Sequence, residues 1–120
     1  MHHAWPSPSM ATGTLAFRCA GGHLVLAALR GGDRLDYARL AAGLGVRRSD
    51  LTAADLTEVG FLPGGVGPVA PKPGPRVALD SAVLTLPVAY CGAGRPDRTL
   101  EIAPADLARV VAAEVFAFSR

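Results

Sequence analysis

The sequence has few of the side chains from which nucleophilic or metal sites are usually built. Its 120 residues include two cysteines, Cys19 and Cys91, and three histidines, without a CxxC pair or any Cys/His spacing typical of a metal site. His23 stands alone, so neither a Cys–His pair nor a Ser–His–Asp set can be assigned. We therefore expect both cysteines to be small buried apolar side chains, and we expect no metal and no cofactor.

Long apolar runs and lysine are scarce as well. No apolar run approaches the roughly 20 residues needed to span a bilayer. The first ten residues lack the basic and apolar parts of a signal peptide. We therefore expect a cytoplasmic protein with no membrane contact. The formal net charge is +2, and Lys72 is the single lysine among twelve basic residues.

Arginine supplies the other eleven basic residues, and three local pairs occur: Arg30/Arg34, Arg47/Arg48 and Arg95/Arg98. The planar guanidinium group can bind a phosphate through two parallel hydrogen bonds. A solvated surface is the simpler interpretation of each pair, so the pairs alone do not predict a nucleic-acid partner.

Glycine and proline are abundant, with 14 and 10 residues, and they concentrate between Gly60 and Pro68, in the order GFLPGGVGP. Glycine lets a ligand approach the backbone closely, and proline fixes the backbone at set points. Four N–H groups remain that can converge on a carbonyl oxygen or an anion, those of Gly64, Gly65, Val66 and Gly67. A tight turn without a ligand is the alternative, and composition alone favours it.

The pattern of apolar residues predicts one domain of mixed α/β class. Half of the residues are hydrophobic, which is enough for a core at this length. Residues 1–12 are predicted to be a flexible lead-in because Pro6 and Pro8 interrupt regular structure. Strands are expected at 14–18, 23–29, 77–79, 88–91, 99–102 and 115–118, with a Gly21-Gly22 turn joining the first two. Helices lie between them, which indicates an α/β or α+β fold around a mixed sheet.

Helices are expected at four places. Tyr37, Leu40, Ala41 and Leu44 have the spacing of a buried helix face that ends at Gly45. Thr52-Ala53-Ala54-Asp55 resembles a capping box for a short helix that buries Leu56 and Val59. Residues 81–84 suit a single helical turn. Pro104 suits the first turn of a last helix, with Leu107, Val110 and Val111 on its buried face.

Several motifs occur in an order that resembles one family. Gly64–Pro68 is similar to a GxxxP loop, and Gly31–Asp36 (GGDRLD) is similar to that family's entry into a helix. Val77–Asp80 (VALD) is similar to a strand end, and Ala93–Arg95 with Leu100–Leu107 is similar to the closing segment. Together these motifs resemble the YbaK/ProX-type aminoacyl-tRNA editing domains over about residues 13 to 119.

The resemblance implies a compact fold in which a mixed sheet curls towards a partial barrel with helices outside. It implies an aminoacyl-tRNA deacylase that acts in translation fidelity by trans-editing. Such an enzyme hydrolyses the ester of a mischarged tRNA, without a metal, in some cases beside an aminoacyl-tRNA synthetase. The catalytic groups would be the backbone amides of the GxxxP loop. The substrate-binding residues would be Thr14, Phe61, Pro68, Asp80 and Gly94.

For two aspartates, capping of a helix is an alternative to a role in the site. Asp36 precedes a predicted helix and is expected to be its N-cap, close to the site, rather than a catalytic acid. Asp80 precedes the predicted turn at residues 81–84 and is interpreted either as its cap or as a substrate-binding residue.

The chain departs from the family at two points. The family usually has a lysine where Gly13 stands in this sequence, and Lys72 would have to reach back to replace its charge. The family's usual N-terminal helical segment is absent before Gly13. We therefore expect residues 13–120 to form a shortened editing domain, with a homodimer contact as one way to cover exposed apolar surface.

These departures leave the function open between three hypotheses. The first is the deacylase. The alternative is a catalytically weakened or inactive descendant that binds tRNA ends or a protein. The third hypothesis is a pocket for a free small acyl ligand.

Overall fold

Two apolar strands joined by a glycine turn form the centre of the main sheet. In the computed structural model, which describes residues 12–55, 67–68, 74–92 and 99–120, β1 (Thr12–Arg18) and β2 (Leu24–Arg30) pair antiparallel. Gly21 and Gly22 both have φ of 88°, a conformation that side chains with a Cβ rarely adopt. The predicted hairpin is therefore confirmed.

Three further strands extend this hairpin on both sides. β4 (Arg76–Asp80) lies parallel to β2, and β7 (Glu114–Phe116) lies parallel to β4. β3 (Thr52–Ala53) pairs antiparallel with β1, so the strand order is β3-β1-β2-β4-β7. A second sheet pairs β5 (Ala89–Gly92) with β6 (Thr99–Ile102). The predicted mixed α/β class is confirmed, with the seven strands of the described residues divided between two sheets.

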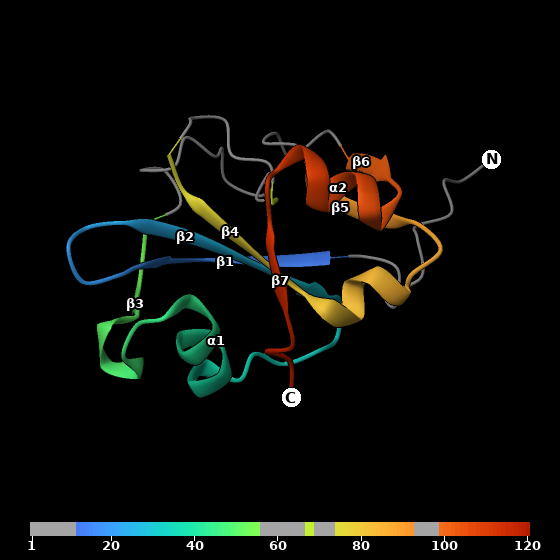
Figure 1. Cartoon of the computed structure of the whole chain (residues 1–120). Helices are drawn as coiled ribbons and strands as arrows, with labels where there is room; N and C mark the ends of the chain where they lie inside the picture. Colours follow the sequence, from blue (N-terminus) through green and yellow to red (C-terminus); the bar gives the residue numbers. More distant parts are fainter. Residues whose placement is uncertain (1–11, 56–66, 69–73, 93–98) are drawn as a thin grey trace.

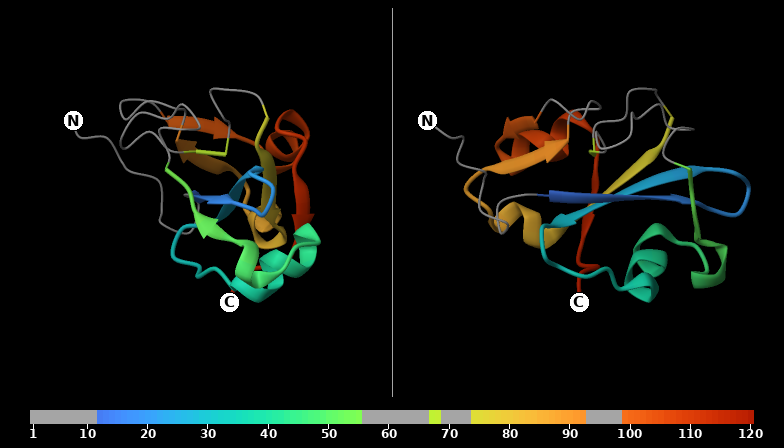
Figure 2. Two further views of the ribbon diagram at one scale, coloured as in Figure 1. Left: turned by 90° about the vertical axis from the view of Figure 1, so that its left-hand side faces the viewer. Right: turned by 180° about the vertical axis from the view of Figure 1, so that it is seen from behind.

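Helices cover the two faces of the main sheet. α1 (Tyr37–Leu44) lies on one face, followed by a 3₁₀ turn η1 (Arg48–Asp50). On the other face lie α2 (Pro104–Val110), β5 and β6 (Figures 1 and 2). The 3₁₀ helix η3 (Ser81–Thr85) follows β4 directly. No helix in the described ranges is long and apolar enough to cross a membrane.

Side chains alternate between these two faces along each strand. Phe17, Val25, Ala27, Leu29 and Ala78 pack against Leu40, Ala41 and Leu44 of α1, and we call this the α1 face. The opposite side, which we call the α2 face, carries Ala16, Leu26 and Val77 in one cluster, and Ala28 and Leu79 with Leu107 of α2 in another.

Local signals explain both ends of α1. Asp36 is the N-cap, and its carboxylate accepts a hydrogen bond from the Arg39 backbone N–H at 3.1 Å. Gly45 ends the helix in the left-handed conformation. Gly43 is required for packing, because a Cβ at this position would overlap the Phe116 ring. The predicted N-cap and stop are both confirmed.

Three predictions about helices are wrong in part. Thr52 and Ala53 form β3 instead of starting a helix, because Ala54 continues the pairing by donating to Ala16 O at 3.0 Å; Leu56 and Val59 lie outside the described residues. Tyr37 is 40% exposed and Val110 is 61% exposed, so neither belongs to a buried helix face. The outer side of Tyr37 instead carries the Arg48 guanidinium group.

Candidate functional site

Three of the predicted site residues, Thr14, Gly67 and Pro68, lie together on the α2 face of the sheet. Thr14 lies two residues before Ala16 on β1, and its neighbour across the strand pair is Ala28. The described segment 67–68, the end of the GxxxP loop, lies over the same face (Figures 1 and 2). Gly67 is buried and Pro68 is fully buried. One face therefore presents a threonine, small alanines and the end of the loop.

The Thr14 hydroxyl is the unusual group on this face. Its Oγ1 atom is buried and, within the part of the chain that the structure describes, has no hydrogen-bond partner. A buried hydroxyl without a partner costs about 1–3 kcal/mol. Native structures rarely retain such a group without a reason, so the Thr14 hydroxyl is the polar group on this face that the described residues leave unexplained.

Thr12, on the same side of β1, behaves differently. Its Oγ1 donates a hydrogen bond to the Tyr90 backbone oxygen at 3.1 Å and so connects the main sheet to β5. Thr12 thus has a structural role, and it provides a matched comparison for Thr14.

Both cysteines are buried, as expected from the sequence. Burial raises the pKa of the Cys91 thiol to about 11, although a hydrogen bond with the Thr12 side chain acts in the opposite direction. Burial is also the main reason that the pKa of Cys19 is raised, with Asp50 adding to the effect and Arg76 opposing it. The thiolate is the nucleophilic form, so neither side chain is suited to nucleophilic catalysis near neutral pH.

Asp80 lies on the α1 face, away from Thr14. Its side chain is fully buried. Oδ1 accepts hydrogen bonds from the N–H groups of Phe118 at 2.7 Å and Ser119 at 3.0 Å. Oδ2 accepts from Ala82 N at 3.2 Å, which confirms the predicted cap of η3. Asp80 is therefore a structural anchor, and its predicted contact with substrate stays a prediction.

Asp36 anchors the same C-terminal segment. Besides capping α1, its backbone N–H donates to Phe118 O at 2.8 Å. The two aspartates thus hold the segment around Phe118 from both sides, and neither lies on the face that carries Thr14.

Gly13 is exposed, and a Cβ at this position would meet no heavy atom within 4 Å. By strand alternation, residue 13 points to the side of β1 opposite to Thr14. Other residues of interest lie outside the described residues: Phe61, Gly64, Gly65, Val66, Lys72 and Gly94. In the described ranges, no three His, Cys, Asp or Glu side chains are placed to hold a metal ion.

Comparison with known proteins decides the family. The sequence model of the aminoacyl-tRNA editing domain matches residues 4–110 of this chain. The chain belongs to the aminoacyl-tRNA editing domain family. The match starts within residues 1–12, which were predicted to be a flexible lead-in. It confirms the resemblance to the editing domains that the ordered motifs indicate.

Solved structures agree with the assignment to the editing domain family. The chain is 28% identical to a protein proposed as a trans-editing enzyme for prolyl tRNA synthetase, with a TM-score of 0.79 over 95% of this chain and 73% of the other. It is 27% identical to the hypothetical protein APE2540, with a TM-score of 0.82 over 95% and 77% of the two chains. A scaffold protein used for epitope grafting has 27% identity and a TM-score of 0.81, over 95% and 74%.

Proposed function

We propose that this editing domain is an aminoacyl-tRNA deacylase that hydrolyses the ester between a small, wrongly attached amino acid and the 3′ end of a tRNA. The observation that supports it most directly is the Thr14 hydroxyl, which is buried without a hydrogen-bond partner among the described residues, on the face that also carries the end of the GxxxP loop (Figure 1). Membership of the editing domain family supports the same reaction. The substrate would be a mischarged tRNA, either free or beside a synthetase.

The reaction needs few protein groups. Water adds to the aminoacyl carbonyl carbon, the ester C–O bond breaks, and the ribose oxygen leaves with a proton. The products are the free amino acid and the tRNA. Negative charge develops on the carbonyl oxygen, and N–H donors arranged in advance stabilise such an oxyanion by about 3–4 kcal/mol. The amides of Gly64, Gly65, Val66 and Gly67 are the proposed donors, and a substrate hydroxyl is the proposed proton carrier.

Thr14 is proposed to contact the substrate through its hydroxyl. We expect Thr14→Val to lower kcat/KM for a mischarged tRNA by about tenfold, the value of one hydrogen bond. The free energy of unfolding should stay the same or rise, because valine removes an unsatisfied buried hydroxyl. Deacylation rates and urea unfolding of the same preparations measure the two effects.

Thr12→Val is the matched control because the Thr12 hydroxyl already has a partner in Tyr90. It should lower the free energy of unfolding by about 1 kcal/mol and leave kcat/KM close to the wild-type value. If Thr14→Val hydrolyses as fast as the wild type and is less stable, the hydroxyl does not serve the substrate.

A second candidate function is a binding descendant that has lost its chemistry, and Gly13 in place of the family's lysine supports it. In that case the wild type binds mischarged tRNA without turnover, and Gly13→Lys restores hydrolysis. The deacylase proposal predicts instead that Gly13→Lys changes an existing rate by less than about threefold. The open space at residue 13 and its position on the side of β1 opposite to Thr14 explain this small expected effect. Rates for both proteins on one mischarged tRNA decide between the two functions.

A further inference from the structure

A cavity of about 190 Å³ lies at the start of α1, on the side of the main sheet opposite to Thr14. This volume is several times the roughly 10–15 Å³ that one water molecule requires, which is room for a phosphate group. The residues that line it come from three parts of the chain: Leu35, Asp36, Tyr37, Ala38, Arg48 and Arg120.

Arg48 is held in place while its hydrogen-bond donors stay available. Its guanidinium carbon lies 4.6 Å from the centre of the Tyr37 ring. The Tyr37 ring is itself fixed by an edge contact with Phe17, with 5.8 Å between the ring centres. Stacking uses the flat face of the guanidinium group, whereas its N–H donors lie in the plane. Arg48 is therefore oriented in advance for an anion.

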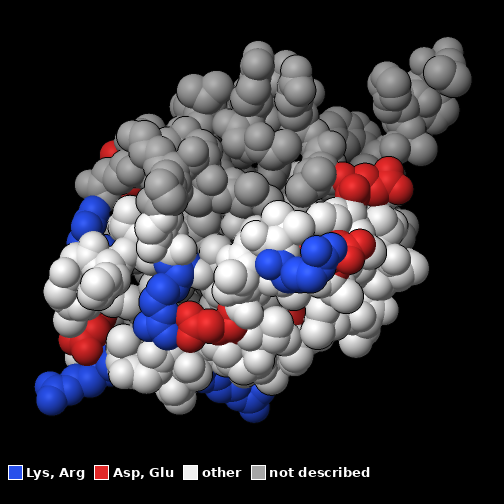
Figure 3. Space-filling model, turned by 45° about the horizontal axis from the view of Figure 1, so that its top comes forward, with Lys and Arg blue, Asp and Glu red and all other residues white. Residues whose placement is uncertain are grey.

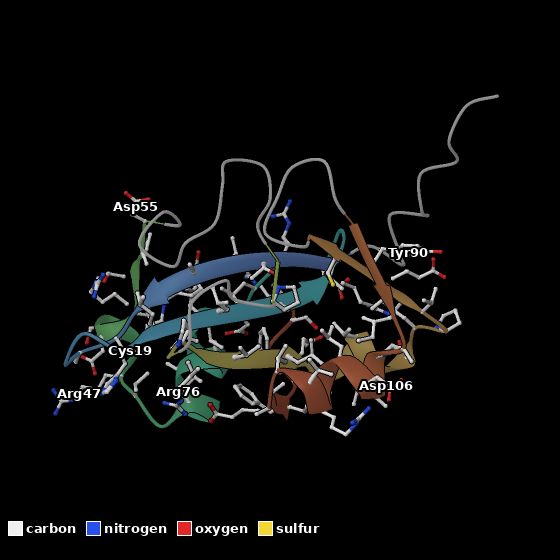
Figure 4. All side chains as sticks on the ribbon, turned by 90° about the horizontal axis from the view of Figure 1, so that it is seen from above. Cys19, Arg47, Asp55, Arg76, Tyr90 and Asp106 are labelled. Carbon is white, nitrogen blue, oxygen red and sulfur yellow. The ribbon has the colours of Figure 1, made fainter. Side chains whose placement is uncertain are left out.

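Arg120 also lines this cavity. The Arg120 backbone N–H donates to Arg34 O at 2.7 Å, and a β-bridge joins Leu35 to Ser119. These contacts fix the end of the described chain against the entry to α1 and place Arg34 beside Arg120. Arg47 is next to Arg48 in the sequence and points outward in Figure 4.

Positive charge accumulates around this cavity. Among the described residues, Arg34, Arg47, Arg48 and Arg120 form no ion pair. Of the charged residues that line the cavity, Arg48 and Arg120 are basic and Asp36 is acidic, and Asp36 already pairs with Arg39.

The carboxylate of Asp36 does not neutralise the two arginines that line the cavity. Its Oδ1 caps α1 by accepting from the Arg39 N–H, and its Oδ2 lies 3.7 Å from Arg39 Nε. Asp36 also occupies the positive end of the helix, so an anion would be held by the arginine side chains.

The opposite side of the molecule has a different charge pattern. In Figure 3, basic and acidic side chains on the α2 side lie beside one another. On α2, Arg109 Nη2 pairs with Asp106 Oδ1 at 3.2 Å. Neutralised arginines of this kind attract polyanions weakly, whereas the arginines at the α1 cavity are not neutralised.

We propose that the α1 cavity binds a backbone phosphate of the tRNA, at a position remote from the aminoacyl end. This inference rests on the proposed function, because it takes a tRNA as the ligand. The sheet separates the cavity from Thr14, so one ligand can contact both only by passing around the edge of the domain. A tRNA is long enough for that path, and a free aminoacyl compound is not.

The test is the binding of uncharged, fluorescently labelled tRNA, followed by anisotropy between about 50 and 200 mM salt. The combined variant Arg48→Gln/Arg120→Gln should bind about tenfold more weakly than the wild type. It should also lower the slope of log K against log salt by about two, because each arginine neutralises about one phosphate charge. Each single variant should show about half of this change in slope. Arg48→Lys, which keeps the charge, should bind with an intermediate affinity.

Arg109→Gln is the matched control, because it also removes one positive charge but lies on α2 and is paired with Asp106. Its affinity should stay within about twofold of the wild type. Urea unfolding of Arg48→Gln checks that the loss of stacking on Tyr37 leaves the protein folded. The inference is overturned if the combined variant and Arg109→Gln bind tRNA equally well, or if the wild type does not bind tRNA.

Uncharged tRNA has no aminoacyl ester, so this assay is independent of deacylation. Binding that depends on Arg48 and Arg120, together with no deacylation by the wild type, would support the phosphate site and reject the deacylase. Deacylation by the wild type, together with tRNA binding that does not depend on the two arginines, would support the deacylase and reject the phosphate site.

Discussion

Replacing Asp80 with alanine is expected to lower the free energy of unfolding by about 3 to 5 kcal/mol. The substitution leaves the backbone N–H groups of Phe118, Ser119 and Ala82 without their acceptor. Hydrogen bonds to a charged acceptor contribute about 1.5–3 kcal/mol each, and three that share one carboxylate are not additive. The measurement is the midpoint of urea unfolding, followed by circular dichroism.

Asp106→Ala is the control for this substitution, because its side chain is 57% exposed and is paired with Arg109 within one helix turn. A loss of at most about 0.5 kcal/mol is expected there. Asp80→Asn should be intermediate, because the amide retains one acceptor oxygen and presents a donor in place of the other. Equal unfolding midpoints for Asp80→Ala and Asp106→Ala would contradict the anchoring role.

Gly64→Ala is expected to slow ester hydrolysis by about ten- to a hundredfold. Gly64 is the first residue of the GxxxP loop, and its N–H is one of the proposed donors to the developing oxyanion. Alanine keeps the N–H, but its Cβ restricts the backbone conformation and the close approach of a ligand. A displaced donor should cost less than the roughly hundredfold or more in rate that follows the complete loss of one oxyanion donor. A single-turnover assay with enzyme in excess over mischarged tRNA measures the effect on the chemical step.

Gly13→Ala is the matched glycine substitution, because its Cβ meets no heavy atom within 4 Å. Its rate should lie within about twofold of the wild type. If Gly64→Ala also reacts at the wild-type rate, the loop does not hold the reacting carbonyl.

Much of the fold follows from local signals in the sequence. Gly21-Gly22 between apolar strands predicts the hairpin, and Asp36 with Gly45 predicts both ends of α1. The failure at Thr52–Asp55 has a clear physical cause. The capping pattern is compatible with a helix, but pairing of Thr52 and Ala53 with β1 satisfies their backbone groups instead. Tertiary pairing overrides a weak local preference.

The candidate site is less predictable because its properties depend on distant parts of the chain. The resemblance to the editing domains points to Thr14, but only the fold shows that its hydroxyl is buried without a partner among the described residues. Asp80 accepts from Phe118, 38 residues away in the sequence. Arg48 and Arg120 likewise line one cavity, although they lie far apart in the sequence and no local sequence pattern predicts that they meet.

The most direct test of the proposed deacylase is the release of amino acid from a panel of mischarged tRNAs by the purified wild-type protein at single turnover. The panel includes tRNAs that carry small, incorrect amino acids. We expect at least one mischarged tRNA to lose its amino acid at least about tenfold faster than in buffer, and Thr14→Val to slow this loss. Rates equal to those in buffer for every mischarged tRNA, from a folded protein, would contradict it.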